Sequence, residues 1–167
     1  MNEVIERETP IGKVKIRPLS KDDFEILYEL FTAITDTDRY FFHPHPFDKE
    51  TAKKLIEEVG NPNVFRVLVI LPSGERELAI GYGFLWDLNT EVPSLGIYIR
   101  NGYQNKKLGH ILMEYLIETA KKLNKKGIAL TVYEDNKKAF HLYQKMGFKV
   151  KRVIYCMELG LYENSSD

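Results

Sequence analysis

Three things that this sequence lacks limit what the protein can be. Cys156 is the only cysteine among 167 residues, which excludes an internal disulfide framework and predicts a cytoplasmic location. The 24 basic and 24 acidic residues balance, so composition predicts neither nucleic acid nor an anionic membrane as a partner. No apolar run approaches the length that spans a bilayer, and the charged N-terminal sequence lacks the apolar core of a signal peptide. We therefore expect a cytoplasmic protein with no nucleic-acid or membrane partner.

Length and hydrophobic content favour one domain that spans residues 1–167. Hydrophobic residues make up 44% of the chain, enough for a sizeable core, and there is no repeat or linker to divide it. Apolar spacing predicts strands over 14–19, 64–71, 77–86, 95–100, 128–133 and from 148 onward. It predicts helices that begin at Ser20, at Asp48, near Leu108 and at Asn136. This order predicts a mixed α/β fold with four helices on a largely antiparallel sheet.

Two motifs between residues 94 and 148 carry the chemistry. The strand SLGIYIR meets the polar loop NGYQNKKLG, and an amphipathic helix follows. A helix N-terminus at the end of a strand offers unpaired backbone N–H groups to an anion. The second motif, NKKAFHLYQKMGF, opens on Asn136 as a natural N-cap and ends at Gly147 as a natural C-cap. Tyr143 lies on the apolar face of this helix, where a tyrosine is most often a core residue.

Both motifs resemble the acyl-CoA-binding half of the GNAT superfamily of N-acetyltransferases. The family's loop pattern, V-x-P-x-Y-(Q/R)-x-x-G-x-(G/A), is similar to this chain at Ile99, Tyr103, Gln104 and Gly109. Its later pattern, N-x-x-A-x-x-x-Y-x-x-x-G-F, is matched without a gap by Asn136, Ala139, Tyr143, Gly147 and Phe148. The loop departs from the family where Asn101 replaces the proline and Lys107 replaces the first glycine. We expect Lys107 to take an ordinary backbone conformation and add a cation to the loop; the alternative is a compromised site.

The resemblance implies the GNAT fold, with a mixed, mostly antiparallel sheet of six or seven strands flanked by four helices. It implies acetyl-CoA as the acyl donor and no metal. The residues expected to bind the donor are Ile97, Ile99, Gln104, Asn105, Lys106, Lys107, Leu108, Gly109, His110, Asn136 and Tyr143. Because only about twenty residues follow Gly147, a seventh strand would be short, merged with the sixth, or supplied by the partner chain of a homodimer.

The implied reaction is direct attack of a primary amine on the thioester, with no covalent acyl-enzyme. Tyr143, a phenol that is still protonated at pH 7, would donate its proton to the departing thiolate. A backbone N–H near Ile99 would stabilise the oxyanion. Motif matching does not select the general base, and each candidate is more often a plain surface residue. The candidates are Glu91, Glu134, His43 and His45.

Residues 35–47 contain Pro44 and Pro46 between aromatic side chains, which predicts a stiff, partly apolar loop. In the resembling family this region borders the acceptor site. The residues expected to contact the acceptor are Tyr40, Phe41, Phe42, His43 and His45. A simple hydrophobic lid is the alternative, and a metal site is disfavoured because no zinc spacing is completed.

Two questions stay open on the sequence. The acceptor amine is a peptide N-terminus, a lysine, a polyamine, an amino sugar or an antibiotic. The alternatives to an enzyme are a module that binds acyl-CoA without turnover and a subunit whose final strand serves assembly.

Overall fold

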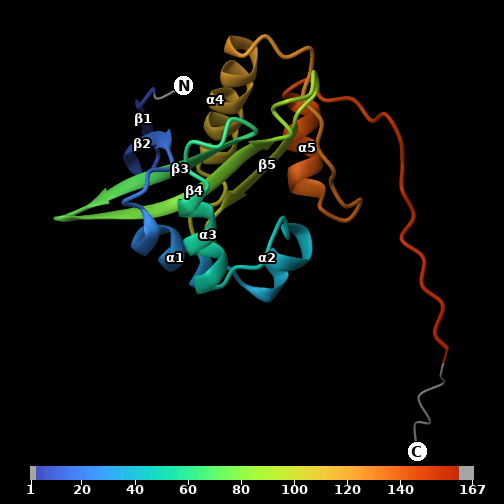
Figure 1. The fold of residues 1–167 in the computed structure, drawn as a ribbon, viewed down its shortest axis with the longest axis horizontal. Coiled ribbons are helices and arrows are strands. Elements are labelled where there is room, and N and C mark those ends of the chain that lie inside the picture. The colour runs from blue at the N-terminus through green and yellow to red at the C-terminus, as the bar shows by residue number, and fades with distance from the viewer. Residues whose placement is uncertain (1–2, 162–167) are drawn as a thin grey trace, which may run out of the picture.

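The computed structural model describes residues 3–161, which form a curled antiparallel sheet between two layers of helices (Figure 1). The elements of this part of the chain are β1 (Ile5–Thr9), β2 (Gly12–Pro18), α1 (Phe24–Thr32), α2 (Asp36–Phe41), α3 (Lys49–Glu57), β3 (Val64–Ser73), β4 (Arg76–Trp86), β5 (Ser94–Ile99), α4 (Leu108–Lys122) and α5 (Lys137–Lys145). No helix within residues 3–161 is both long enough and apolar enough to cross a membrane.

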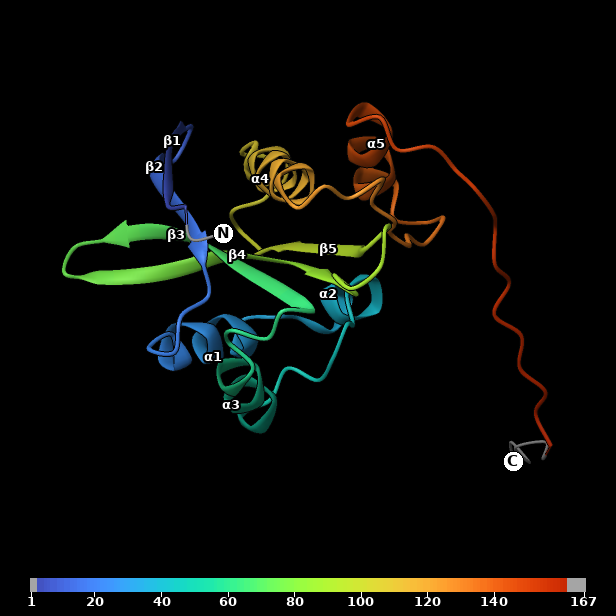
Figure 2. The same ribbon diagram turned by 45° about the horizontal axis from the view of Figure 1, so that its top comes forward.

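The sheet has the strand order β1-β2-β3-β4-β5, and every neighbouring pair is antiparallel. Figure 2 shows α4 and α5 on one face of the sheet and α1 and α3 on the other. Each face covers its own apolar cluster, with Leu112 of α4 fully buried in one and Phe31 of α1 in the other. Burial of one such side chain contributes about 1.5–3 kcal/mol. The predicted mixed α/β fold is confirmed, with five strands in the described residues rather than six or seven.

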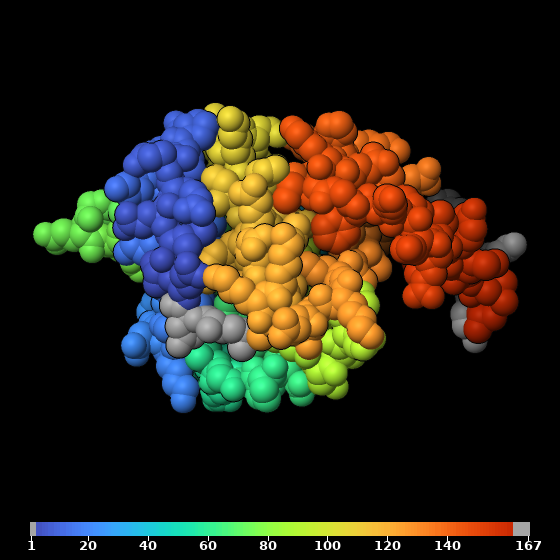
Figure 3. Space-filling model, turned by 90° about the horizontal axis from the view of Figure 1, so that it is seen from above, coloured from blue at the N-terminus to red at the C-terminus, as the bar shows by residue number. Residues whose placement is uncertain are grey.

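The C-terminal third differs from the prediction. Residues 128–133 form one parallel bridge, in which Ala129 accepts from the N–H of Leu95 (2.8 Å) and donates to the carbonyl of Pro93 (3.0 Å). Beyond that bridge the segment is extended but is not part of the sheet. Residues 149–161 are extended and exposed, and they project from the body beside α5 (Figure 3). The predicted strands at 128–133 and from 148 onward are therefore wrong as paired strands, because a strand needs a ladder partner as well as an apolar pattern.

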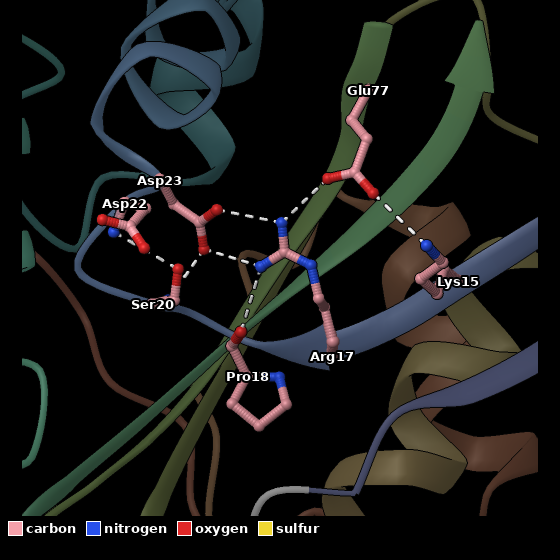
Figure 4. Close-up of polar contacts among 7 residues, drawn as sticks. All are labelled: Lys15, Arg17, Pro18, Ser20, Asp22, Asp23 and Glu77. Atoms are coloured by element: carbon pink, nitrogen blue, oxygen red, sulfur yellow. Dashed lines mark hydrogen bonds and ion pairs between the residues drawn. The ribbon is translucent and has the colours of Figure 1, made fainter. Parts of the chain in front are cut away.

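The first helix begins at Phe24, not at Ser20, because Ser20 to Asp23 form a turn instead. The Asp23 carboxylate accepts from the N–H of Ser20 (2.7 Å) and from both terminal nitrogens of Arg17 (2.6 and 2.9 Å) (Figure 4). Burial by itself would raise the pKa of Asp23, but the bonds from Arg17 and Ser20 lower it overall. Glu77 joins the same guanidinium at 3.1 Å, which ties the start of α1 to β4.

The predicted loop over 35–47 contains a short helix, α2. The Thr35 hydroxyl accepts from the N–H of Asp38 (3.1 Å), and the Asp38 carboxylate accepts from the N–H of Thr35 (3.0 Å). This reciprocal pair is a capping box with aspartate in place of the usual glutamate. No residue of α2 is buried, so it carries no apolar period that the sequence could reveal. The predicted cap at Asp48 is confirmed, since its carboxylate accepts from the N–H of Thr51 (2.7 Å).

Candidate active site

The site is organised by the free edge of β5, the edge that faces away from β4. The N–H of Leu95 points to Ala129, whereas that of Arg100 points to Ile80 on β4 (2.8 Å). Because backbone groups alternate along a strand, those of Ile97 and Ile99 point the same way as that of Leu95. The Ile99 carbonyl accepts from the side-chain amide of Gln104 at 3.2 Å. The free edge therefore presents two backbone N–H groups next to the loop that follows.

The loop from 101 to 107 connects β5 to the N-terminus of α4. Asn105 and Lys107 both have positive φ, 59° and 64°, and Lys107 is the N-cap of α4. The expectation of an ordinary conformation at Lys107 is therefore wrong, because the residue keeps the left-handed geometry that a glycine would supply at this position. A non-glycine residue there costs roughly 1–2 kcal/mol. Backbone N–H groups that converge in such alternating conformations form concavities suited to anions, and the helix dipole adds to this.

Gly109 fixes the distance between this loop and α5. A Cβ built on Gly109 would lie 3.2 Å from Cδ2 of Leu142, so a side chain at 109 would press α5 outward. His110, one residue on, is hydrogen-bonded to Glu114 at 3.1 Å on the exposed side of α4. Gly109 therefore brings the helix that carries Tyr143 close to the first turn of α4.

Tyr143 is half-buried against the cluster that contains α4, with its ring centroid 6.0 Å from that of Phe148. Burial raises the pKa of Tyr143 to about 12. Asn136 caps α5 as predicted, because its side chain accepts from the N–H of Ala139 at 3.4 Å. The phenol is therefore protonated across the physiological pH range and is held on a capped helix beside α4.

An aromatic lip, defined as Tyr40 to Phe47, lies across the sheet from α5. The Phe42 ring stacks on Tyr98 of β5 at 5.6 Å, and the Tyr98 hydroxyl donates to Asp38 at 3.1 Å. Burial, followed by the Asp38 charge, raises the pKa of Tyr98. The lip is thereby anchored to β5, the strand that carries the free edge.

The lip also reaches residues 133–135, just before α5. The Tyr40 hydroxyl donates to Asp135 at 3.1 Å, a bond that raises the pKa of Tyr40, and its ring lies 5.2 Å from that of Tyr133. His43 stacks on Tyr133 at 5.6 Å, with its Nε2 3.3 Å from the Tyr133 hydroxyl. Sequence reasoning missed Tyr133 and Asp135; the available signal was their position on either side of Glu134 in the turn after an apolar segment.

His45 faces inward rather than toward residues 133–135. Its Nδ1 is 2.8 Å from the Pro46 carbonyl and its Nε2 3.3 Å from the Tyr82 hydroxyl. Burial lowers the pKa of His45 and raises that of Tyr82 to about 12. A neutral ring that donates from Nδ1 and accepts at Nε2 satisfies both contacts.

An open pocket of about 340 Å³ is lined by Arg39, His43, His45, Pro46, Phe47 and Asp48.

The two carboxylates that were considered as bases lie apart. Glu134 is exposed in the turn between the lip contacts and α5. Glu91 lies beyond the Ser94–Ala129 bridge, where it is ion-paired with Lys126 at 2.5 Å. The structure therefore brings Glu134, but not Glu91, to the end of the sheet that holds the loop, the lip and α5. Residues 3–161 contain no group of three potential metal-ligating side chains.

Comparison with known proteins gives consistent results. A family model described as Acetyltransferase (GNAT) family matches residues 24–148. A spermidine N(1)-acetyltransferase of Thermoplasma acidophilum is 28% identical over 147 residues, which cover 83% of this chain and 89% of the relative. Among solved structures, the ribosomal-protein-S5-alanine acetyltransferase of Vibrio fischeri has a TM-score of 0.76 at 16% identity and covers 90% of this chain and 85% of its own. Mycobacterium smegmatis RimJ, in complex with CoA-disulfide, has a TM-score of 0.70 at 12% identity, with 87% and 75% covered.

Proposed function

Because this chain belongs to the GNAT family of acetyltransferases, we propose that it transfers the acetyl group of acetyl-CoA to a primary amine of a small molecule, with Tyr143 as general acid. The observation that carries this proposal is the convergence of three features at one end of the sheet. These are the free N–H groups of β5, the left-handed loop at the start of α4, and a half-buried, protonated phenol on α5. The single cysteine supports a cytoplasmic location.

On this proposal the diphosphate of the donor binds the backbone N–H groups from Gln104 to Gly109, with the ammonium groups of Lys106 and Lys107 adding positive charge. The amide-bearing arm of the donor then pairs with the free edge of β5, where Ile97 and Ile99 offer N–H groups. The left-handed conformation of Lys107 supports this assignment, because the chain retains a strained geometry there without a glycine.

The chemistry follows from that placement. The amine nitrogen attacks the thioester carbonyl carbon, and the N–H of Ile99 stabilises the oxyanion that forms. The carbon–sulfur bond then breaks, and the Tyr143 hydroxyl gives its proton to the thiolate. A base removes one proton from the attacking ammonium, directly or through water. Glu134 is the candidate that geometry favours, because it lies in the turn between the lip and α5.

We favour a polyamine as the acceptor, and the name of the Thermoplasma relative supports this class. The contact between the lip and residues 133–135 combines the rings of Tyr40 and Tyr133 with the carboxylate of Asp135. Aromatic faces attract ammonium groups, and a nearby carboxylate strengthens that attraction. Exposed Glu134 adds a second negative charge that a polycation with several ammonium groups can contact.

The test is thiol release from acetyl-CoA with a panel of amines: spermidine, spermine, a lysine ester, glucosamine and a short peptide. Tyr143→Phe should lower kcat by about 10²- to 10³-fold, as loss of a general acid does, with little change in the KM for acetyl-CoA. Tyr28→Phe, on the remote helix α1, is the matched control. Unaltered turnover in Tyr143→Phe would remove Tyr143 as the acid. Coenzyme A binding by calorimetry without thiol release from any amine would instead support a non-catalytic module.

A further inference from the structure

Two tyrosines on neighbouring strands form a pair next to the lip. Tyr82 of β4 and Tyr98 of β5 lie directly opposite each other in the antiparallel register, and 1% and 6% of them are exposed. Both belong to the apolar cluster on the α1 side of the sheet, where Figure 2 shows α2 below β5. A buried tyrosine keeps its hydroxyl hydrogen-bonded, because an unpaired polar group in the interior costs free energy. The partners of these two hydroxyls are therefore held in place by them.

Both hydroxyls bond to the segment that contains the lip. The Tyr98 hydroxyl donates to the carboxylate of Asp38, in α2 just before the lip, at 3.1 Å. The Tyr82 hydroxyl lies 3.3 Å from Nε2 of His45, near the other end of the lip. Between these two positions in the sequence, the Phe42 ring contacts both tyrosine rings, with centroid distances of 6.3 Å to Tyr82 and 5.6 Å to Tyr98. One cross-strand pair therefore holds the lip on both sides of Phe42.

Tyr98 also connects the lip to the backbone groups that are proposed to contact the acyl donor. It lies between Ile97 and Ile99, whose N–H groups point to the free edge of β5. On the same face of β5 as Tyr98 lies Gly96, where an added Cβ would collide with the Phe84 ring. Phe84 thus fills the space over Gly96, and Tyr98 is the side chain through which β5 reaches the lip. The place of the lip is therefore set by the strand that presents the N–H groups.

We propose that Tyr82 and Tyr98 are positioning residues that hold the lip in place at the acceptor site and thereby determine how well the amine binds. This inference rests on the proposed function, because it assigns the lip to the acceptor. The two tyrosines act through Asp38 and His45 and take no part in proton transfer. The bonds from the lip to residues 133–135 are exposed, so water can replace them, whereas the two buried hydroxyls depend on the lip for these bonds.

Hydrogen exchange tests the positioning without any substrate. The backbone N–H groups of Asp38 and Phe42 are hydrogen-bonded within the capped helix α2. Their exchange should be about fivefold faster or more in Tyr98→Phe, because the lip then opens more often. Tyr115→Phe is the matched control, since Tyr115 is 8% exposed and its hydroxyl donates to the Glu3 carbonyl, away from the lip. Unchanged exchange in Tyr98→Phe, or equally fast exchange in Tyr115→Phe, would overturn the proposal.

Steady-state kinetics test the effect on the acceptor. Tyr82→Phe and Tyr98→Phe should each raise the KM for the amine by about fivefold or more, while the KM for acetyl-CoA stays within about twofold. Tyr115→Phe loses a comparable buried bond, so it should lower the Tm but leave the KM for the amine unchanged. The same rise in Tyr115→Phe, or no rise in the two lip variants, would refute the positioning role. If the unaltered protein acetylates no amine, the proposed function fails, and hydrogen exchange still decides whether the two hydroxyls hold the lip.

Variants of Asp38 separate its position from its charge. Asparagine keeps an oxygen that can accept from the Tyr98 hydroxyl and the N–H of Thr35, whereas alanine removes both bonds. Asp38→Asn should therefore keep the KM for the amine within about twofold, and Asp38→Ala should raise it at least as much as Tyr98→Phe does. In the Asp38→Ala background, Tyr98→Phe should raise it no further. An Asp38→Asn variant as impaired as Asp38→Ala would show that the charge of Asp38 acts on the amine directly, which contradicts the proposal.

Discussion

Replacement of Lys107 by glycine tests whether the loop at the start of α4 is built as an anion site. Lys107 caps α4 with φ 64° and ψ 3°, a conformation in which its Cβ crowds the backbone. Glycine adopts that conformation freely, so Lys107→Gly releases the strain and removes the ammonium group. Lys107→Ala removes the same ammonium group but keeps the Cβ, and so keeps the strain.

The expected magnitudes follow from these two effects. Release of the left-handed strain contributes roughly 1–2 kcal/mol. The greater freedom of glycine in the unfolded chain offsets about 0.4–1 kcal/mol of it. Lys107→Gly should therefore be about 0.5–1 kcal/mol more stable than the unaltered protein, which raises the Tm by about 1–4 °C in a domain of this size. Lys107→Ala should show no gain.

Coenzyme A binding supplies the second readout. If the diphosphate binds this loop as proposed, both variants lose one exposed positive charge beside it, so the Kd should rise by about three- to fivefold in each, and less at high salt. Urea unfolding of the free proteins and calorimetric titration at two salt concentrations measure the two effects separately. Lys107→Gly that is no more stable than Lys107→Ala would refute strain at this position, and unchanged affinity for coenzyme A in both variants would refute the anion site.

Three further predictions concern the fold and the site. Asp23→Asn should cost about 2–3 kcal/mol in urea unfolding near neutral pH because it weakens the charged hydrogen bonds with Arg17. Since the folded pKa of Asp23 is lowered, that contribution is present above its unfolded value and is lost as the pH falls below about 4, where the two proteins should converge. Tyr40→Phe removes the bond to Asp135 and should raise the KM for the amine about threefold while the KM for acetyl-CoA stays constant. The raised pKa of Tyr143 predicts that kcat does not decline between pH 8 and pH 10; an alkaline loss with an apparent pKa below about 10.5 would contradict its role as acid.

Local features of this protein could be predicted from the sequence because their causes lie within a few residues. The apolar stripe of α4 recurs every three to four positions, and Asn136 and Asp48 cap helices through N–H groups three residues away. The loop before α4 and the segment around Tyr143 of α5 could also be recognised as motifs, because the residues of each motif lie close together in the sequence. Helix α2 escaped prediction because none of its residues is buried and a capping box with aspartate is a weak signal.

Only the tertiary structure decided how distant segments meet. The contacts of Tyr40 with Asp135 and of His43 with Tyr133 join residues at least 90 positions apart, and no local spacing encodes such pairs. The strand propensity of residues 128–133 could be recognised in the sequence. Whether another strand pairs with them along their length depends on the path of the whole chain. The left-handed backbone of Lys107 was likewise set by the turn from β5 into α4, which overrides the preference of the residue itself.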